Sequence, residues 1–404
     1  MQHARTPWRP QWRTLYSGAA SRMGLAIVLG VVVGLAAPQQ AVALKLLCDG
    51  FIRVIGWMMP MIVCLLVSSA VAGLCRQRRA AGLSLKMLLW FQAMTWLAVV
   101  IGTASALAFT ASANSDPAAG LHGHTAGALA GIAAQLAASP VVQVVLAGIA
   151  VGGVCSRSPR LQAALERGWQ GCHKLLRWVL RFAPLAAFAA VAFTVGRYGA
   201  ASLWPMLTFL ALIHLACGLF VVLVLHSALR VLRVPLWPLL RYLRQELLLV
   251  LTTGASLAAL PGLANKMEAL GCQREAARLV LTSGYSFNLS GSVLYLVCAV
   301  LFLLSQMHVS LGVADIAWVM AMAGLASLGS TSVAGSSFMT LLATLQLLGM
   351  GHPEALGLLL GMERLMKCRL LTNVIGNCVA CLVISRWQGE WARPSLHRAL
   401  GLPG

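Results

Sequence analysis

The 404-residue sequence has few charged residues. Charged residues make up 10% of the chain and hydrophobic residues 59%, whereas soluble domains carry about 25% and about 45–50%. This composition excludes a soluble globular enzyme. It also excludes a disordered chain, because so apolar a sequence does not stay solvated. It indicates a polytopic membrane protein.

Acidic residues are the scarcest charged type. Only 10 residues are Asp or Glu, against 30 Lys and Arg, so the formal net charge is +20. The basic residues cluster in the breaks between apolar runs, for example at 76–79 and 157–167. This placement is typical of cytoplasmic loops and disfavours a nucleic-acid-binding surface.

The cysteines and histidines show no pattern typical of a metal site, a disulfide framework or an enzyme. The 11 cysteines are scattered, mostly within apolar runs. Cys378 and Cys381 have C-x-x-C spacing, but they fall in an apolar run at helical spacing. We interpret the cysteines as small buried hydrophobic residues. We expect no catalytic residues, no metal and no cofactor.

The first part of the chain contains six apolar stretches that are long enough to cross a membrane. They lie near 23–46, 51–75, 84–112, 134–154, 172–196 and 200–230. Basic clusters follow alternate stretches, and the break at 112–137 has no Lys or Arg. This alternation predicts six membrane helices with the N-terminus in the cytoplasm. The first stretch is too long for a signal peptide, so we expect it to be retained.

The last 160 residues contain three clusters of Ser, Thr and Gly within apolar sequence, at 252–256, 284–292 and 327–337. Such segments are poor membrane helices, because irregular backbone at membrane depth must be buried in protein or line a cavity. One interpretation is small-residue packing between helices. Three clusters together favour re-entrant hairpin tips and a broken helix that form a binding centre.

Three polar residues follow at helical spacing. Arg369, Asn373 and Asn377 are four residues apart, so a helix places them on one face. An arginine inside a membrane is costly and indicates function. Its guanidinium suits two-point recognition of a carboxylate. The alternative is an arginine that pairs with backbone carbonyls or reaches the membrane surface.

Two long segments resemble the dicarboxylate/amino acid:cation symporter family, and most closely its bacterial C4-dicarboxylate carriers. Residues 241–298 include the run GYSFNLSGS, and residues 361–377 read GMERLMKCRLLTNVIGN. Residues 48–64 and 181–199 are also similar to that carrier, so the resemblance covers almost the whole chain.

The resemblance implies an all-α polytopic membrane fold with eight transmembrane helices and two re-entrant helical hairpins. The family assembles as a homotrimer in the lipid bilayer, and a transport domain slides against a scaffold as an elevator. The hairpins are expected at 242–266 and 318–349. Helix seven is expected to break at Asn288, and helix eight to span 354–386.

The implied organisation has four parts. A cytoplasmic N-terminal tail spans 1–22, and a cytoplasmic C-terminal tail spans 387–404. The six helices of 23–233 form mainly the scaffold, with helices three and six joining the transport domain. The transport core spans 234–386. The implied location is the bacterial inner membrane, with both termini in the cytoplasm.

The resemblance also implies site residues. The substrate-binding residues are Arg369, Asn373, Thr372, Ser256, Ser292, Ser332 and Val333. The cation-binding residues are Gly284, Ser286, Asn288, Ser290, Asn373, Asn377, Ser327, Ser330 and Thr95. The coupling ion is Na⁺ or H⁺.

The sequence departs from the family where cations bind. Ser290 stands where the family has Asp, and the first hairpin tip has lost its glutamate and most hydroxyls. One residue is missing just before Arg369, which rotates the upstream half of a helix by about 100°. Of the ten carboxylates, only Glu363 is expected deep in the membrane near the site. We therefore expect weakened cation sites.

The expected function is secondary transport of C4-dicarboxylates such as succinate, fumarate and malate. An amino-acid carrier is an alternative, although Lys367 would repel a substrate ammonium group. A transport-deficient paralogue that senses substrate or binds a partner is another. The basic tail after Arg386 is expected either on the inner membrane surface or disordered.

Overall fold

The computed structural model describes residues 19–76, 81–110, 140–199, 203–254, 256–306, 312–327, 365–389 and 391–401, and a few positions between 340 and 359. The described residues form helices and turns and contain no strand. In a helix the backbone N–H and C=O groups bond to one another. A membrane requires this, because hydrocarbon offers these groups no hydrogen-bond partner.

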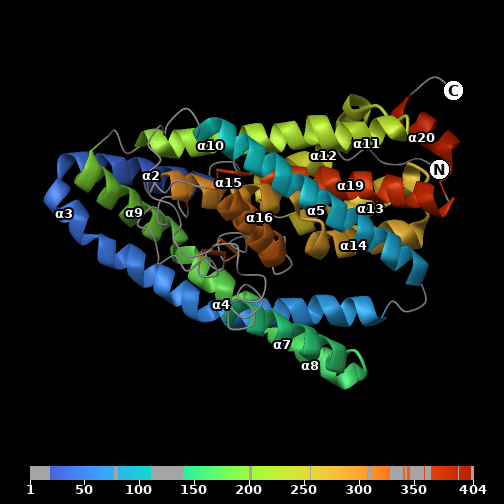
Figure 1. Cartoon of the computed structure of the whole chain (residues 1–404), viewed down its shortest axis with the longest axis horizontal. Helices are drawn as coiled ribbons and strands as arrows, with labels where there is room; N and C mark the ends of the chain where they lie inside the picture. The colour runs from blue at the N-terminus through green and yellow to red at the C-terminus, as the bar shows by residue number, and fades with distance from the viewer. Residues whose placement is uncertain are drawn as a thin grey trace, which may run out of the picture.

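A first group of helices packs together. Its elements are α2 (Ala19–Ala36), α3 (Pro38–Ala43), α4 (Lys45–Arg76), α7 (Pro140–Cys155), α8 (Pro159–Val179), η2 (Leu180–Phe182) and α9 (Ala183–Tyr198). Helix α2 packs against α9, and α4 packs against α7, α8 and α9 (Figure 1). Small residues make the contacts close: a Cβ added at Gly30 would lie 2.8 Å from the Phe188 carbonyl oxygen.

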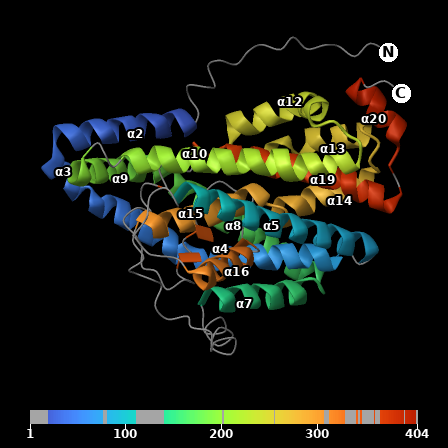
Figure 2. The ribbon, with the colours of Figure 1, turned by 45° about the horizontal axis from the view of Figure 1, so that its top comes forward.

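A second group contains the remaining described elements. They are α5 (Ala81–Thr110), α10 (Leu203–Leu219), η4 (Phe220–Leu225), α11 (His226–Val231), α12 (Leu236–Thr253), η5 (Ser256–Ala259), α13 (Leu260–Ala269), α14 (Arg274–Phe287), α15 (Ser290–Gln306), α16 (Val313–Ser327), α19 (Cys368–Gln388) and α20 (Arg393–Leu400). Helix α15 lies at its centre, against α5, α10, α16 and α19 (Figure 2). Among described residues, contacts between the two groups are sparse.

Four described helical stretches are long and apolar enough to cross a membrane. They are Leu85–Phe109, Leu203–Val231, Arg274–Gln306 and Cys368–Gln388. The last two are almost wholly buried in protein, whereas α2 exposes Leu25, Val28 and Val32. Apolar side chains so exposed need lipid or another subunit to cover them.

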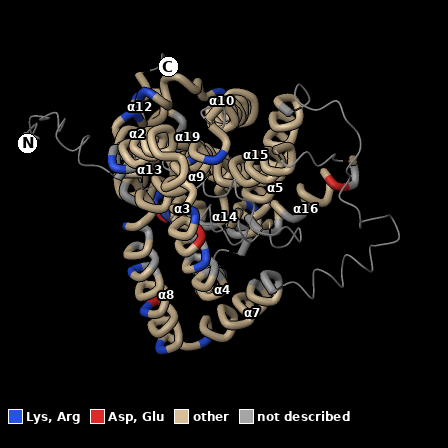
Figure 3. Tube along the Cα trace, turned by 90° about the vertical axis from the view of Figure 1, so that its left-hand side faces the viewer, with Lys and Arg blue, Asp and Glu red and all other residues tan. Residues whose placement is uncertain are grey.

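Two expected boundaries were wrong. The stretch 23–46 is not one helix, because α2 ends at Ala36 and Pro38 starts α3; the residue before a proline disfavours helical backbone. The basic segment 157–167 is not a loop, because most of it belongs to α8. Figure 3 shows basic residues along α8, where exposed charged side chains are compatible with a helix.

The C-terminal segment is docked on the second group, so the disordered tail is wrong for residues 391–401. The Trp391 indole Nε1 donates to the Leu270 carbonyl at 3.1 Å, and the Ala392 N–H donates to the Gly271 carbonyl at 3.1 Å. Gly271 has φ +92, and a Cβ there would lie 2.3 Å from the Ala392 carbonyl oxygen. The turn therefore requires glycine.

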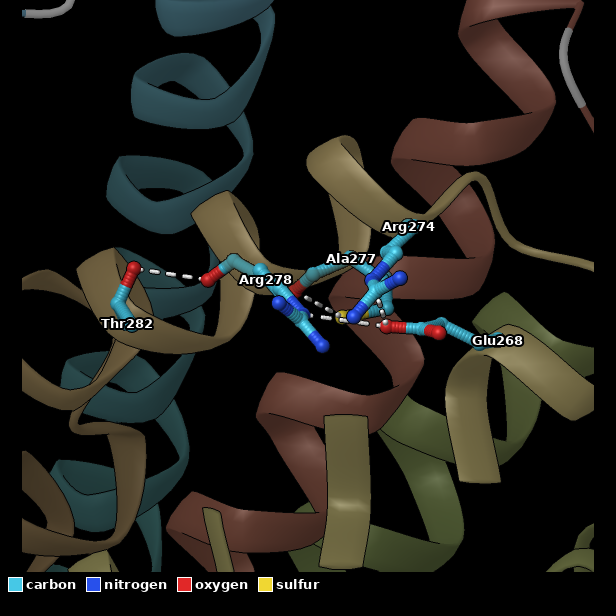
Figure 4. Close-up of polar contacts among 6 residues, drawn as sticks. Glu268, Arg274, Ala277, Arg278 and Thr282 are labelled. Carbon is cyan, nitrogen blue, oxygen red and sulfur yellow. Dashed lines mark hydrogen bonds and ion pairs between the residues drawn. The ribbon is translucent and has the colours of Figure 1, made fainter. Parts of the chain in front are cut away.

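The turn between α13 and α14 is also held by charge. The Glu268 carboxylate lies 3.2 Å from Arg278 Nε and 3.7 Å from Arg274 Nε (Figure 4). Both arginines are exposed, so this cluster contributes little to stability on its own.

Candidate functional site

The centre of the candidate site is an interruption of a buried helix. Helix α14 ends at Phe287, Asn288 has the non-helical dihedrals φ −122 and ψ 66, and α15 begins at Ser290. The break predicted at Asn288 is confirmed. Asn288 is only 1% exposed, so the break exposes backbone N–H and C=O groups deep inside the protein.

Helix α19 faces this break with two asparagines. The Asn373 Oδ1 accepts the Gly291 N–H at 2.7 Å, and its Nδ2 donates to Ser292 Oγ at 3.2 Å. One turn on, the Asn377 Oδ1 accepts from Asn288 Nδ2 at 2.9 Å. These bonds tie α19 to the break and to the first turn of α15, and every residue in them is buried.

Two glycines permit this close approach. A Cβ at Gly284 would lie 2.4 Å from Asn377 Oδ1, and a Cβ at Gly291 would lie 2.2 Å from the Arg369 carbonyl oxygen. Real Cβ atoms do not come so close to another atom. Gly291 therefore lets the start of α15 lie against the start of α19, and Gly284 lets the end of α14 lie against Asn377.

Arg369 places a positive charge at this junction. It is 4% exposed, it is the second residue of α19, and its Cζ lies 5.2 Å from the centre of the Tyr295 ring. The start of α15 contacts the Arg369 backbone. Helix N-termini carry partial positive charge. Two such termini and a guanidinium make a site whose chemistry suits an anion.

The tip of a helical hairpin completes the described part of the site. Helix α12 ends at Thr253 and is followed by Gly254, whose φ of +66 and ψ of 21 are left-handed, and η5 then leads into α13. The carbonyl of Ser256 accepts from the Tyr285 hydroxyl at 3.0 Å. The Ser256 Oγ is buried and makes no hydrogen bond within the described part of the chain. It is thus an available partner for a ligand.

The two arms of this hairpin are joined by a partly buried ion pair. Lys266 Nζ contacts Glu246 Oε2 and donates to the Tyr242 carbonyl at 2.7 Å. The hairpin expected at 242–266 therefore exists, although its helices extend over 236–269.

Comparison with known proteins decides the family. A sequence profile of the Sodium:dicarboxylate symporter family matches residues 20–387. The chain belongs to the sodium:dicarboxylate symporter family. It is therefore a multi-pass membrane transporter, and not an enzyme.

Related proteins match nearly the full chain. C4-dicarboxylate transport protein 1 of Ralstonia nicotianae is 33% identical over 416 residues, covering 97% of this chain and 96% of the relative. The C4-dicarboxylate transport proteins of Rhodospirillum rubrum and Rhizobium johnstonii are 35% and 34% identical. In both, 93% of this chain and 90% of the relative are covered.

The structure brings together most of the described residues that the family resemblance had indicated. Gly284, Asn288, Ser290 and Asn377 lie at the break, with Ser290 Oγ 3.4 Å from Asn288 Oδ1. Ser286 lies in the last turn of α14.

The other residues that the family resemblance had indicated are connected less directly to the helix break, or lie outside the described residues. Thr372 Oγ1 donates to the Cys368 carbonyl of its own helix at 3.0 Å. Thr95 is buried on α5, which packs against α14, α15 and α19. Ser327 ends α16. Ser330, Ser332 and Val333 lie outside the described residues, as does most of the hairpin expected at 318–349.

The helix expected over 354–386 is not continuous in the described residues. Residues 365–367 form a turn, and the described helix begins at Cys368. Arg369 is consequently near a helix start and not in the middle of a helix. The missing residue before Arg369 had indicated altered geometry here, and a turn accommodates it. Glu363 lies outside the described residues.

Sequence reasoning missed three contributors to the site. Tyr295 contacts Arg369, and Tyr285 holds the hairpin tip. Lys367 directly precedes α19, and its Nζ donates to the Leu251 carbonyl in the last turn of α12. Tyr285 lies within the run GYSFNLSGS and Tyr295 lies just after it, so this run could have indicated both tyrosines. No sequence spacing pointed to the Lys367 contact.

The described residues hold no metal-binding constellation. They contain no group of three or more His, Cys, Asp and Glu side chains that could hold a metal ion. The oxygens at the break come from amides, hydroxyls and backbone. Such neutral ligands suit a weakly held monovalent cation better than a divalent metal.

Proposed function

We propose that this chain is a secondary active symporter of C4-dicarboxylates such as succinate, fumarate and malate. Its place is the bacterial inner membrane, with both termini in the cytoplasm. Family membership and the names of the relatives support this proposal. The observation that carries it is Arg369, a buried cation at the meeting point of two helix N-termini.

The site suggests a role for each side of the substrate. Arg369 binds one carboxylate through two parallel hydrogen bonds. Ser256 Oγ and the backbone of the hairpin tips bind the other carboxylate, with Ser332 and Val333 contributing from the second tip. Asn373, Thr372 and Ser292 complete the proposed substrate set.

An amino-acid substrate fits less well. An α-amino acid carries an ammonium group, which needs a nearby carboxylate. The residue at the start of α19 is instead Lys367, whose ammonium already lies at the end of α12. A second cation there is repelled. A dianion meets no such repulsion.

Cation binding is proposed at the helix break. Asn288, Ser290, Asn377 and Gly284 supply the nearest neutral oxygens, with Thr95 and Ser286 beside them. Ser327 and Ser330 belong to a second proposed site. Because none of these residues is a carboxylate, we propose that both sites hold Na⁺ weakly.

Energetics require some coupling for uptake against a gradient. Each negative charge that enters a cell at −100 mV costs about 2.3 kcal/mol. A dianion therefore accumulates only with co-transported cations, which are Na⁺ or H⁺. A carrier that has lost both couplings exchanges dicarboxylates, or acts as a substrate sensor.

The two helix groups support an elevator mechanism. All described contacts of the site come from the second group, and contacts between the groups are sparse. We propose that the second group, formed by helices three and six and the core 234–386, moves within the bilayer. The rest of 23–233 holds a homotrimer, and 1–22 and 387–404 are cytoplasmic.

Uptake into proteoliposomes tests the proposal. Labelled succinate uptake is measured with a Na⁺ gradient, a proton gradient, and neither. The test variants are Arg369→Lys and Arg369→Gln. The matched control is Arg386→Gln, which removes an exposed arginine from the other end of the same helix.

The proposal expects gradient-driven uptake in the wild type and in Arg386→Gln. Uptake falls at least about tenfold in Arg369→Gln, because one charge-assisted interaction of about 1.5–3 kcal/mol is lost. Melting temperatures of all variants separate this loss from unfolding. Uptake that Arg369→Gln leaves unchanged removes Arg369 from the site. Competition by aspartate or serine, but not by fumarate, contradicts the dicarboxylate assignment.

A further inference from the structure

A cavity away from the substrate site lies between α12 and the docked C-terminal helix α20. Its volume is about 700 Å³, and its wall includes Trp237, Arg241 and Arg244 of α12, Lys266 of α13, and Leu400 of α20. Figure 2 shows these three helices together at one end of the molecule. The transport proposal makes no use of this cavity.

The cavity wall is positively charged. Arg241, Arg244 and Lys266 line it, and no carboxylate does within the described part of the chain. Lys266 is neutralised by Glu246. Arg241 and Arg244 are exposed, and they are left to face the cavity with two full charges. The cavity also lies beside the first turn of α12, whose N–H groups add partial positive charge.

The two arginines of the wall belong to an amphipathic stripe along α12. Trp237, Arg241, Arg244 and Leu248 follow one another at spacings of four, three and four, so they form one stripe on the helix. Trp237 is 76% exposed and Leu248 is 54% exposed. The two arginines therefore lie between exposed apolar side chains on the same face of α12, with Trp237 before them and Leu248 after them.

We propose that this cavity binds the phosphate group of an anionic phospholipid. Arg241 and Arg244 bind the phosphate oxygens by charge-assisted hydrogen bonds, and the acyl chains lie along the stripe toward Leu248. Basic pockets beside membrane helices are suited to such headgroups. The apolar continuation of the stripe favours a lipid over a soluble phosphate compound.

Because of where the cavity lies, a bound lipid would affect the packing of the C-terminal segment. Helix α20 forms the opposite wall, and it packs against both α12 and α13. A phosphate between the two arginines of α12 relieves their mutual repulsion beside α20. The bound lipid therefore holds the C-terminal segment on the first hairpin.

Binding of defined lipids to the purified full-length protein tests this inference. The probes are phosphatidylglycerol, phosphatidylcholine and soluble glycerol 3-phosphate, and bound lipid is counted by native mass spectrometry. The test variant is Arg241→Gln/Arg244→Gln. The matched control is Arg160→Gln/Arg167→Gln, which removes the same charge from exposed positions of α8, a helix that does not line the cavity.

The expected result is retention of phosphatidylglycerol over phosphatidylcholine in the wild type and the control. The affinity for phosphatidylglycerol falls at least tenfold in the test variant, whose melting temperature without lipid stays near that of the wild type. Equal losses in the test variant and the control overturn the site, because they show a general effect of charge. Saturation by glycerol 3-phosphate at matching affinity overturns the lipid as the ligand. A test variant that no longer folds is replaced by Arg241→Lys/Arg244→Lys, for which the inference expects retained preference for phosphatidylglycerol.

Discussion

At the scale of single residues, the site is defined by amides that hold backbone and by glycines that let backbones meet. The side chains of Asn373 and Asn377 form hydrogen bonds to residues of the broken helix. Gly284 and Gly291 remove the side chains that would keep the helices apart. In the proposed cation site, the neutral side chain of Ser290 lowers the expected strength of cation binding.

Ser290→Asp is expected to strengthen Na⁺ dependence. A carboxylate at the first residue of α15 is favoured by the helix N-terminus, and it supplies the charged oxygen ligand that the break lacks. Succinate uptake measured at several Na⁺ concentrations, with Ser290→Asn as the neutral control, checks this. An unchanged Na⁺ response in Ser290→Asp means that the cation site has lost its geometry as well as its charge.

Gly284→Ala is expected to destabilise the protein by about 1–3 kcal/mol, which is typical of overpacking. Its Cβ would lie 2.4 Å from Asn377 Oδ1, so α19 must move away. Thermal unfolding in detergent measures the change. The control is Gly171→Ala, whose Cβ has no neighbour within 4 Å. A melting temperature that falls no further in Gly284→Ala than in Gly171→Ala contradicts the packing described at the break.

At the scale of elements, Lys266 joins the two arms of the hairpin, because it pairs with Glu246 and donates to the Tyr242 carbonyl. The Glu246–Lys266 pair has side chains that are 10% and 20% exposed, so it is protected from most solvent screening. It lies on the face of α12 that is turned toward α13.

Glu246→Gln is expected to cost about 1.5–3 kcal/mol, because a charge-assisted hydrogen bond is lost. Adding Lys266→Met to Glu246→Gln should cost less than the sum of the single changes, because the two residues interact directly. Thermal unfolding of the two single variants and the double variant gives the coupling. Glu275→Gln, an exposed glutamate on α14, is the control. If the changes in the free energy of unfolding are strictly additive, Glu246 and Lys266 do not form a cross-link between the arms.

Local pattern in the sequence predicted a broken helix among the Ser, Thr and Gly clusters and the polar face of α19, and the family resemblance placed the break at Asn288. Hydroxyl, amide and glycine residues marked the break, and a spacing of four marked the face. The turn at 365–367 and the docking of Trp391 were not predictable in this way. They depend on which backbone groups meet in space, and Lys367 and Leu251 are far apart in sequence.

At the scale of the whole molecule, the second group carries the entire described site. The first group contributes none of its contacts, and it presents exposed apolar residues on α2. Spin labels can test whether the groups move as bodies. Trp57 on α4 is 81% exposed, while Trp204 on α10 and Val231 on α11 are 73% and 85% exposed.

Addition of succinate is expected to change the distance between labels at Trp57 and Val231. The distance between labels at Trp204 and Val231, which both belong to the second group, should stay constant. Pulsed electron spin resonance, with accessible native cysteines replaced and labelled subunits diluted by unlabelled ones, measures both distances. A change in the Trp204–Val231 distance that equals the Trp57–Val231 change contradicts movement as two bodies.

The confinement of the site to one group has a thermodynamic consequence. A movement that carries Arg369, Asn373 and the hairpin tip together preserves the distances among them. The dissociation constant for substrate is then the same on either side of the membrane. Affinity drives accumulation in no carrier, so in the proposed symport the steady-state concentration ratio depends on what travels with the substrate. Under that proposal, the oxygen cluster at Asn288, rather than Arg369, couples dicarboxylate accumulation to the cation gradient.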